Sequence, residues 1–85
     1  MNTKKISGYV FCKKTNRVLH NPIVYWFGED GNIHEKIFGT KSEGRFDIEL
    51  PEGVKKLYVG NRGYSVREIL LKPTMDNIIV HLNKN

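Results

Sequence analysis

The chain has 85 residues, of which 39% are hydrophobic and 27% are charged, and its formal net charge is +5. This length supports one hydrophobic core only, so we expect a single domain that spans residues 1–85. The composition excludes a disordered tail. Because no stretch approaches the roughly 20 consecutive apolar residues that a membrane crossing requires, we also expect no membrane insertion.

The N-terminus and the single cysteine limit the compartment and the chemistry. Met1 to Lys5 carries the positive charge of a signal-peptide start, but residues 6–9 alternate in polarity and never become a continuous apolar stretch. We therefore expect no export signal in the chain as given, which fits either a cytosolic protein or a processed or excised module. Cys12 stands alone, so neither an intrachain disulfide nor a cysteine-based zinc site is possible. Its strand position is typical of a small buried hydrophobe.

The first half of the chain reads as short strands separated by polar turns. Alternate positions of residues 6–13 are apolar or small, which predicts a first strand. A polar turn region covers 14–21, and Pro22 then opens a second strand over 23–27 that is apolar on both faces. Residues 28–32 are rich in Gly, Asp and Asn, which favour a hairpin turn.

The second half continues this pattern. We expect a third strand over 33–40 and a turn at 42–44, followed by the clearest amphipathic strand over 45–50. A fifth strand is marked by Leu57 and Val59. The remaining expected strands are 64–71, ended by Pro73, and 78–82. Evidence for a helix is weak, because only 66–71 has helical spacing, with no cap before it and a proline after it.

The order of several short motifs is recognisable. The most specific are the Thr-x-x-x-Gly-x-Phe-x-Ile run at 40–48 and the pair Gly63-Tyr64, with Leu50-Pro51-Glu52-Gly53 between them. Together with the segments at 6–10, 18–24 and 79–82, they resemble the carboxypeptidase regulatory-like domain, a transthyretin-like or prealbumin-like β-sandwich. The resemblance covers nearly the whole chain.

Glycines give these motifs a physical meaning. Gly44 lets the chain reverse so that Phe46 enters the core, and Gly63 does the same for Tyr64, whose hydroxyl we expect to reach a backbone partner. Two departures from the family pattern occur. Val18 stands where the family usually has proline, and Asn21-Pro22 replaces Gly-Ala, although Asn tolerates a left-handed backbone and Pro suits the first residue of a strand.

The resemblance implies a fold and a role. The fold is an all-β, seven-stranded, two-sheet Greek-key sandwich of the prealbumin type. The role is that of an accessory module without catalytic residues of its own, found beside peptidase domains, at the front of outer-membrane receptor plugs or in bacterial cell-surface chains. It therefore suggests the cell envelope or periplasm as the location.

Residues that carry chemistry are scattered in the sequence. His20, His34 and His81 show no metal-ligand spacing, so we expect surface or satisfied interior histidines. Glu29-Asp30-Gly31-Asn32 lacks the order of acids of a calcium loop and reads as a hairpin turn. We find no nucleophile elbow, phosphate loop or dinucleotide fingerprint. We expect no catalytic, metal or cofactor-binding residue and no cofactor.

Large apolar side chains exceed what the core of a sandwich requires. If Val10, Val24 and Trp26 face the core, the residues that point outward are Tyr9, Phe11, Ile23, Tyr25 and Phe27. Three interpretations remain open. In the first, Trp26 exchanges places with Tyr25 and loops cover the other residues. In the second, the outward residues form a face for protein binding or self-association. In the third, they stack on sugar or single-stranded nucleic acid.

The positive charge is unevenly placed. Residues 1–28 contain no acid, whereas nine bases and nine acids follow from Glu29 onward. The candidate basic patch on the first two strands and their connection comprises Lys4, Lys5, Lys13, Lys14 and Arg17. It either attracts phosphate or acidic polymers or is a solvated edge that lysines protect from aggregation.

These observations favour a non-catalytic accessory module that mediates protein–protein interaction or spacing, with another protein or a second copy as partner. The alternative is binding of a polyanion, such as nucleic acid, or of a glycan through the basic, aromatic N-terminal strands. An enzyme is the third and weakest interpretation, since it requires His and carboxylate side chains that converge in a pocket.

Overall fold

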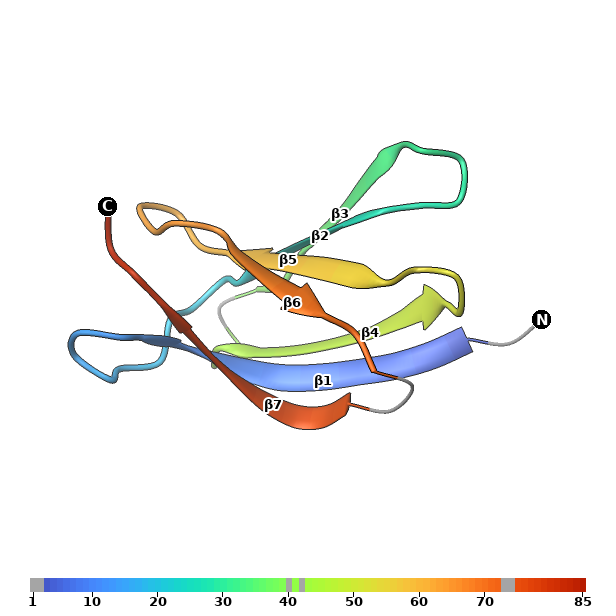
Figure 1. The fold of residues 1–85 in the computed structure, drawn as a ribbon. Coiled ribbons are helices and arrows are strands. Elements are labelled where there is room, and N and C mark those ends of the chain that lie inside the picture. Colours follow the sequence, from blue (N-terminus) through green and yellow to red (C-terminus); the bar gives the residue numbers. More distant parts are fainter. Residues whose placement is uncertain (1–2, 40, 42, 73–74) are drawn as a thin grey trace.

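A computed structural model describes residues 3–39, 41, 43–72 and 75–85, excepting the side chains of residues 75 and 76 (Figure 1). The described residues form seven strands and no α-helix. The strands are β1 (Thr3–Cys12), β2 (Ile23–Phe27), β3 (Ile33–Ile37), β4 (Arg45–Pro51), β5 (Lys56–Gly60), β6 (Arg67–Leu70) and β7 (Met75–Leu82). They make a three-stranded sheet of order β4-β1-β7 and a four-stranded sheet of order β3-β2-β5-β6. The expected all-β sandwich of two sheets is confirmed. This described part holds no helical segment with the length and hydropathy that a membrane crossing requires.

The connections explain how the two layers form. Hairpins join β2 to β3 and β5 to β6 within one sheet, and every other connection crosses to the opposite sheet. The strand β1 lies at the centre of the three-stranded sheet, where it pairs antiparallel with β4 and parallel with β7. The first and last strands of the chain are therefore neighbours.

Strand ends differ from the expected bounds at several places. The first strand begins at Thr3, because Thr3 to Ser7 already pair with β4. The third ends at Ile37, and Thr40, the expected last residue, lies outside the described residues. The sixth begins at Arg67 rather than at Tyr64, which forms only an isolated bridge to Lys84.

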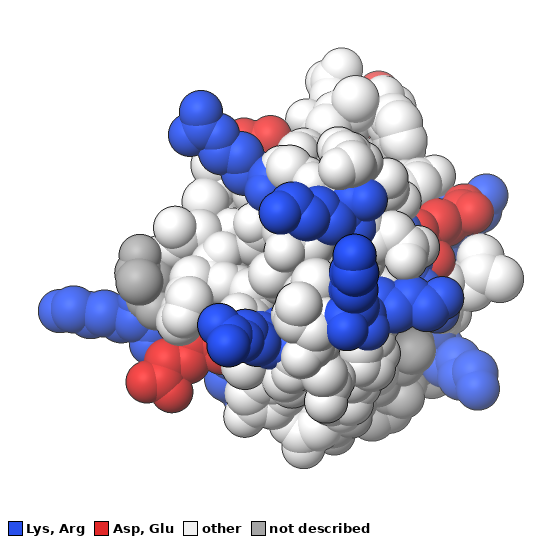
Figure 2. All heavy atoms as spheres, turned by 90° about the vertical axis from the view of Figure 1, so that its left-hand side faces the viewer, with Lys and Arg blue, Asp and Glu red and all other residues white. Residues whose placement is uncertain are grey.

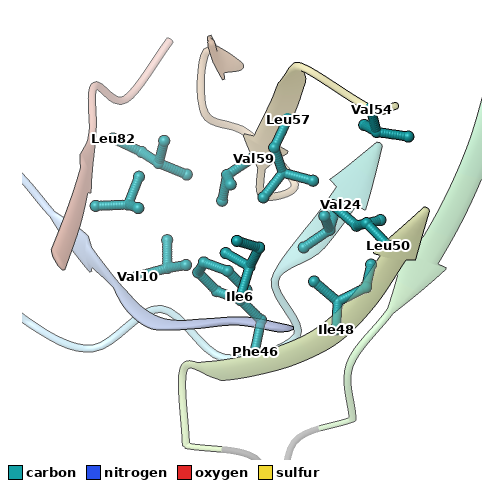
Figure 3. Close-up of a cluster of buried hydrophobic side chains, with 11 residues drawn as sticks. Ile6, Val10, Val24, Phe46, Ile48, Leu50, Val54, Leu57, Val59 and Leu82 are labelled. Atoms are coloured by element: carbon teal, nitrogen blue, oxygen red, sulfur yellow. The ribbon is translucent and has the colours of Figure 1, made fainter. Parts of the chain in front are cut away.

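The core lies between the sheets and contains the inward side chains of both (Figure 3). On β4 the alternation is regular: the even-numbered residues are buried, and Asp47 and Glu49 on the other face are exposed. Fully burying one such side chain contributes about 2 kcal/mol. The cluster consists of Ile6, Val10, Val24, Phe46, Ile48, Leu50, Val54, Leu57, Val59, Val80 and Leu82.

The turn residues behave as their chemistry requires. Gly44 and Gly63 have φ values of +80° and +85°, and Phe46 lies fully buried two residues after Gly44. Asn21 adopts φ 60°, so the asparagine takes the left-handed position expected of it, directly before the buried Pro22.

Gly8 marks a close approach of two neighbouring strands, β1 and β7. A Cβ atom at this position would lie 2.4 Å from the carbonyl oxygen of Ile78 and 2.9 Å from Cζ of Phe46. Both distances are far below van der Waals contact, and the first neighbour is backbone. The register between β1 and β7 shifts between Ile6 and Gly8. Only glycine fits here without moving the neighbouring strand.

Gly8→Ala should therefore destabilise the fold by about 3 kcal/mol through overpacking, as measured by chemical denaturation. Gly39→Ala is the matched control, because a Cβ atom there meets nothing within 4 Å, and its effect should stay within about 0.5 kcal/mol. Equal effects of the two substitutions would contradict the close approach.

Candidate interaction surfaces

The five outward residues of the sequence analysis lie on two different sheets. Tyr9 and Phe11 are on β1, in the three-stranded sheet, whereas Ile23, Tyr25 and Phe27 are on β2, in the four-stranded sheet. They do not form one patch. Trp26 packs partly buried against the core, so it does not exchange places with Tyr25. The sandwich thus has two outer faces, each with its own candidate residues.

The outer face of the three-stranded sheet is polar, and other side chains cover its aromatic rings. The Arg45 guanidinium lies 5.4 Å from the centre of the Tyr9 ring and donates a hydrogen bond of 3.2 Å to the Tyr9 hydroxyl. The Phe11 ring lies 5.8 Å from the His81 ring, centre to centre. Asp47 is exposed beside Arg45, with a closest N–O distance of 3.8 Å. This face offers little apolar surface to a partner.

The outer face of the four-stranded sheet is different. Strand register places three rows of side chains across it. The middle row holds Tyr25 beside Tyr58, with Glu35 and Glu68 at its two ends. Apolar residues make up most of the rows on both sides, with Lys56 beside Leu70 in one of them. We call this surface the outer apolar face, and its members are Ile23, Tyr25, Phe27, Ile33, Ile37, Tyr58, Val66 and Leu70.

Most of the large exposed apolar groups of the described chain lie on the outer apolar face. Seven large hydrophobic residues are exposed among the described residues, and five of them belong to this face, each between 51% and 67% exposed. They are Phe27, Ile33, Ile37, Val66 and Leu70. Exposed hydrophobic residues scattered singly need no explanation, but a concentration on one face marks an interaction site.

Polar groups on the outer apolar face are few. The Lys56 ammonium lies 3.0 Å from a Glu68 carboxylate oxygen, and this hydrogen bond and its charge raise the pKa of Lys56. The Tyr58 hydroxyl donates to the same carboxylate at 3.4 Å. Within the described residues Glu35 forms no salt bridge. The face therefore presents apolar surface with one free carboxylate at its β3 edge.

The strand β3 forms the open edge of this face. All five of its residues are exposed, and Figure 1 shows the tip of the β2–β3 hairpin extending beyond the two layers. The Trp26 ring stacks on the His34 ring at 5.6 Å. The Asp30 carboxylate accepts a 2.9 Å hydrogen bond from the Asn32 backbone N–H, which lowers the pKa of Asp30. Residues 28–32 thus form the expected hairpin turn.

The five predicted basic residues do not form one patch either. Lys4 and Lys5 lie near the start of β1, whereas Lys13, Lys14 and Arg17 follow its end, about 25 Å away. The Lys4 ammonium donates to the Val54 carbonyl at 2.8 Å, and Lys5 is opposite Glu49. Lys4 is therefore engaged locally, and Lys13, Lys14 and Arg17 belong to a different surface from the first two cations.

That surface is the end of the sandwich where the β1–β2 connection, the β5–β6 connection and the segment after β7 meet, and it is rich in cations (Figure 2). Arg62, Arg67 and Lys84 join the three residues that follow β1. These six cations come from segments that are far apart in sequence, so the distribution of charge along the chain does not reveal that they form one group. We call Lys13, Lys14, Arg17, Arg62, Arg67 and Lys84 the basic end.

Cys12 lies buried next to the basic end, with 4% of its surface exposed. The side-chain and backbone donors of Thr15, the Tyr64 hydroxyl and the Lys14 backbone N–H all favour its thiolate, and they lower the pKa of Cys12 to about 7. The same contact raises the pKa of Tyr64. The Tyr64 hydroxyl thus faces the Cys12 thiol, a side-chain partner that the sequence did not predict.

The histidines are far apart along the fold. His20 lies in the β1–β2 connection, His34 on β3 and His81 on β7. Among the residues that the structure describes, no group of three or more His, Cys, Asp or Glu side chains is placed to hold a metal ion.

Sequence reasoning missed five of the eight members of the outer apolar face. It identified the three members on β2 but not Ile33, Ile37, Tyr58, Val66 or Leu70. The third strand did carry a signal in the sequence. Ile33 and Ile37 each lie two residues from Glu35, so all three side chains point to the same side of the strand. Only the pairing register shows that these residues share a face with β2.

Comparison with protein-family models, with curated proteins and with solved structures found no match.

The contacts of Cys12 generate a prediction about pH. The fold favours the thiolate, so its contribution to stability should be present at pH 9 and lost as the pH falls through about 7. Thiolate absorbance of the folded protein should titrate near pH 7, and Tyr64→Phe should raise that midpoint because one donor is lost. Cys12→Ala supplies the baseline. A midpoint near 9 in the unchanged protein would contradict the contacts.

Proposed function

We propose that this protein is a non-catalytic β-sandwich module that binds another protein by burying the outer apolar face. The observation that carries the proposal is the concentration of exposed Phe, Ile, Val and Leu side chains on one sheet face. Burying each of these side chains in an interface contributes on the order of 1–2 kcal/mol before the costs of association.

The geometry of the face suits a protein surface better than a small molecule. The face is a pleated layer four strands wide, and Tyr25 and Tyr58 lie at its centre. Centrally placed tyrosines surrounded by apolar residues are typical of the residues that dominate binding energy in protein interfaces. The free carboxylate of Glu35 at the β3 edge favours a partner with a basic group opposite it.

The partner we propose is a different protein rather than a second copy paired along β3. An antiparallel pair of two β3 strands centred on Glu35 would set two carboxylates directly opposite each other, which is destabilising. Shifting such a pair by two residues would set two Lys36 or two His34 side chains opposite instead. Edge-to-edge self-association therefore gains no charge complementarity in these registers.

The resemblance to carboxypeptidase regulatory-like domains supports an accessory role, and seven strands in two sheets are what it implies. A place in a bacterial cell envelope follows from this resemblance alone and is part of the proposal. The alternative of a polyanion or glycan bound across Tyr9, Phe11 and Tyr25 requires a common surface, but these residues lie on opposite faces of the sandwich.

Crosslinking tests the proposal directly. A photoreactive phenylalanine analogue replaces Phe27 on the outer apolar face or, as control, Tyr9 on the opposite face. We expect the analogue at position 27 to capture one protein in the source cells and the analogue at position 9 to capture little of it. Equal capture at both positions would contradict the assignment of the face.

Affinity for that captured protein, once purified, gives the second measurement. The double substitution Ile33→Lys and Ile37→Lys should weaken binding by at least tenfold, because two exposed apolar groups become charged. The control Glu49→Lys makes the same +2 change in net charge at an exposed residue of the other sheet and should change the affinity less than twofold. Light scattering across concentrations detects self-association, and loss of that association in the double variant would identify a second copy as the occupant instead.

A further inference from the structure

The basic end is assembled by hydrogen bonds between segments that are distant in sequence. The Lys13 backbone N–H donates to the Leu82 carbonyl at 2.9 Å, which ties the β1–β2 connection to the end of β7. The Asn61 side-chain amide donates to the His20 carbonyl at 2.7 Å, and the Ser65 backbone N–H donates to the Asn83 carbonyl at 2.9 Å. The cations on these segments are therefore held on one common surface.

The net charge of the chain resides on this surface. Of the 14 Lys and Arg residues, six belong to the basic end, and residues 13–22, 61–67 and 81–85 contain no Asp or Glu. The other eight cations are distributed among all nine acids. All six are exposed, and none forms a salt bridge within the described residues. Figure 2 shows blue side chains across this end, with red ones only toward the outline of the view.

A hollow of about 350 Å³ opens between two of these cations, Lys13 and Arg67. The Arg67 guanidinium donates to the His81 carbonyl at 3.3 Å, which fixes it at the wall. The Ser65 hydroxyl is held by a 2.7 Å hydrogen bond to the Asn85 side chain. The lining residues are Lys13, Ser65, Val66, Arg67, His81, Leu82 and Asn83.

This chemistry suits phosphate. A phosphate presents several oxygens to donors from different directions, and Arg matches them with its planar fork, whereas Lys contributes a point charge. One hollow accommodates one such group. The other exposed cations of the basic end lie outside the hollow and require additional anions. The successive phosphates of a phosphodiester chain provide them.

We infer that the basic end binds the phosphate backbone of a nucleic acid strand, with one phosphate in the hollow between Lys13 and Arg67. An anionic membrane is the less suitable partner, because the large apolar residues exposed near this end are Val18 and Val66 and none is an exposed aromatic anchor. His81, which lines the hollow, already packs its ring against Phe11. Base stacking is therefore absent, and recognition is independent of sequence.

Fluorescence anisotropy with a labelled 20-nucleotide single-stranded RNA and a 20-base-pair DNA duplex tests the inference. We expect binding of at least one probe with little dependence on its sequence. The affinity should fall on the order of 100-fold between 50 and 200 mM salt, because phosphate contacts release counterions. No binding of either probe at 50 mM salt would overturn the inference.

Variants matched in charge distinguish binding at a local site from attraction by the net charge of the whole protein. The double substitution Lys13→Gln and Arg67→Gln should weaken binding at least tenfold and reduce the slope of log affinity against log salt by about 1.4 for the RNA. The double substitution Lys5→Gln and Lys55→Gln removes the same charge away from the basic end and should weaken binding less than twofold. Equal losses in the two variants would overturn the site, provided that circular dichroism shows both folded.

Competition identifies the anion. Unlabelled RNA should displace the probe, whereas polyglutamate of equal charge and vesicles containing phosphatidylserine should displace it at least tenfold less effectively. Equal displacement by polyglutamate would show that any acidic chain binds. Stronger binding to the vesicles than to either nucleic acid would assign the surface to lipid headgroups. Either outcome would overturn the inference.

Discussion

The close approach of β1 and β7 at Gly8 is the constraint on which the sandwich depends. The absence of a side chain at Gly8 lets the ring of Phe46 and the side chain of Ile78 occupy the centre of the three-stranded sheet. Phe46 in turn belongs to the cluster that joins the two sheets. A chain of 85 residues has little stability to spare, so this one small position determines how well both layers pack.

Because the core lies between the sheets, the side chains on the outer face of each sheet are not needed for it. The two outer faces differ in composition. On the three-stranded sheet, Arg45 covers Tyr9, and charged residues of β4 point outward. On the four-stranded sheet the outward positions hold Ile, Val, Leu, Phe and Tyr. The net positive charge lies on neither face but at one end of the sandwich. The apolar surface and the basic surface thus occupy different parts of the molecule and meet at Val66, which belongs to the outer apolar face and also lines the hollow of the basic end.

Alternation of apolar residues made most of the fold predictable, since a period of two identifies strands such as β4 directly. Gly44 and Asn21 were also predictable, because few residues tolerate a left-handed backbone. The same reasoning did not show which strands share a sheet. Tyr9 and Tyr25 both point outward, as the alternation predicts, yet they lie on opposite faces. The six cations of the basic end come from three segments, and only tertiary structure brings them together. The role of Gly8 was equally hidden, because nothing in the residues around it reveals what the neighbouring strand places against it.

The parallel pairing of β1 with β7 has a consequence for the order in which the protein is built. Ile6 is paired with Met75, so the contact that completes the three-stranded sheet joins residues almost as far apart as the chain allows. Until β7 docks, β4 is the one strand of the described sheet that can pair with β1, and the other backbone edge of β1 remains open. Contacts so distant in sequence are slow to form, and an open edge invites pairing with other chains. Efficient folding of this sandwich therefore depends on how rapidly β7 docks against β1 once it is available.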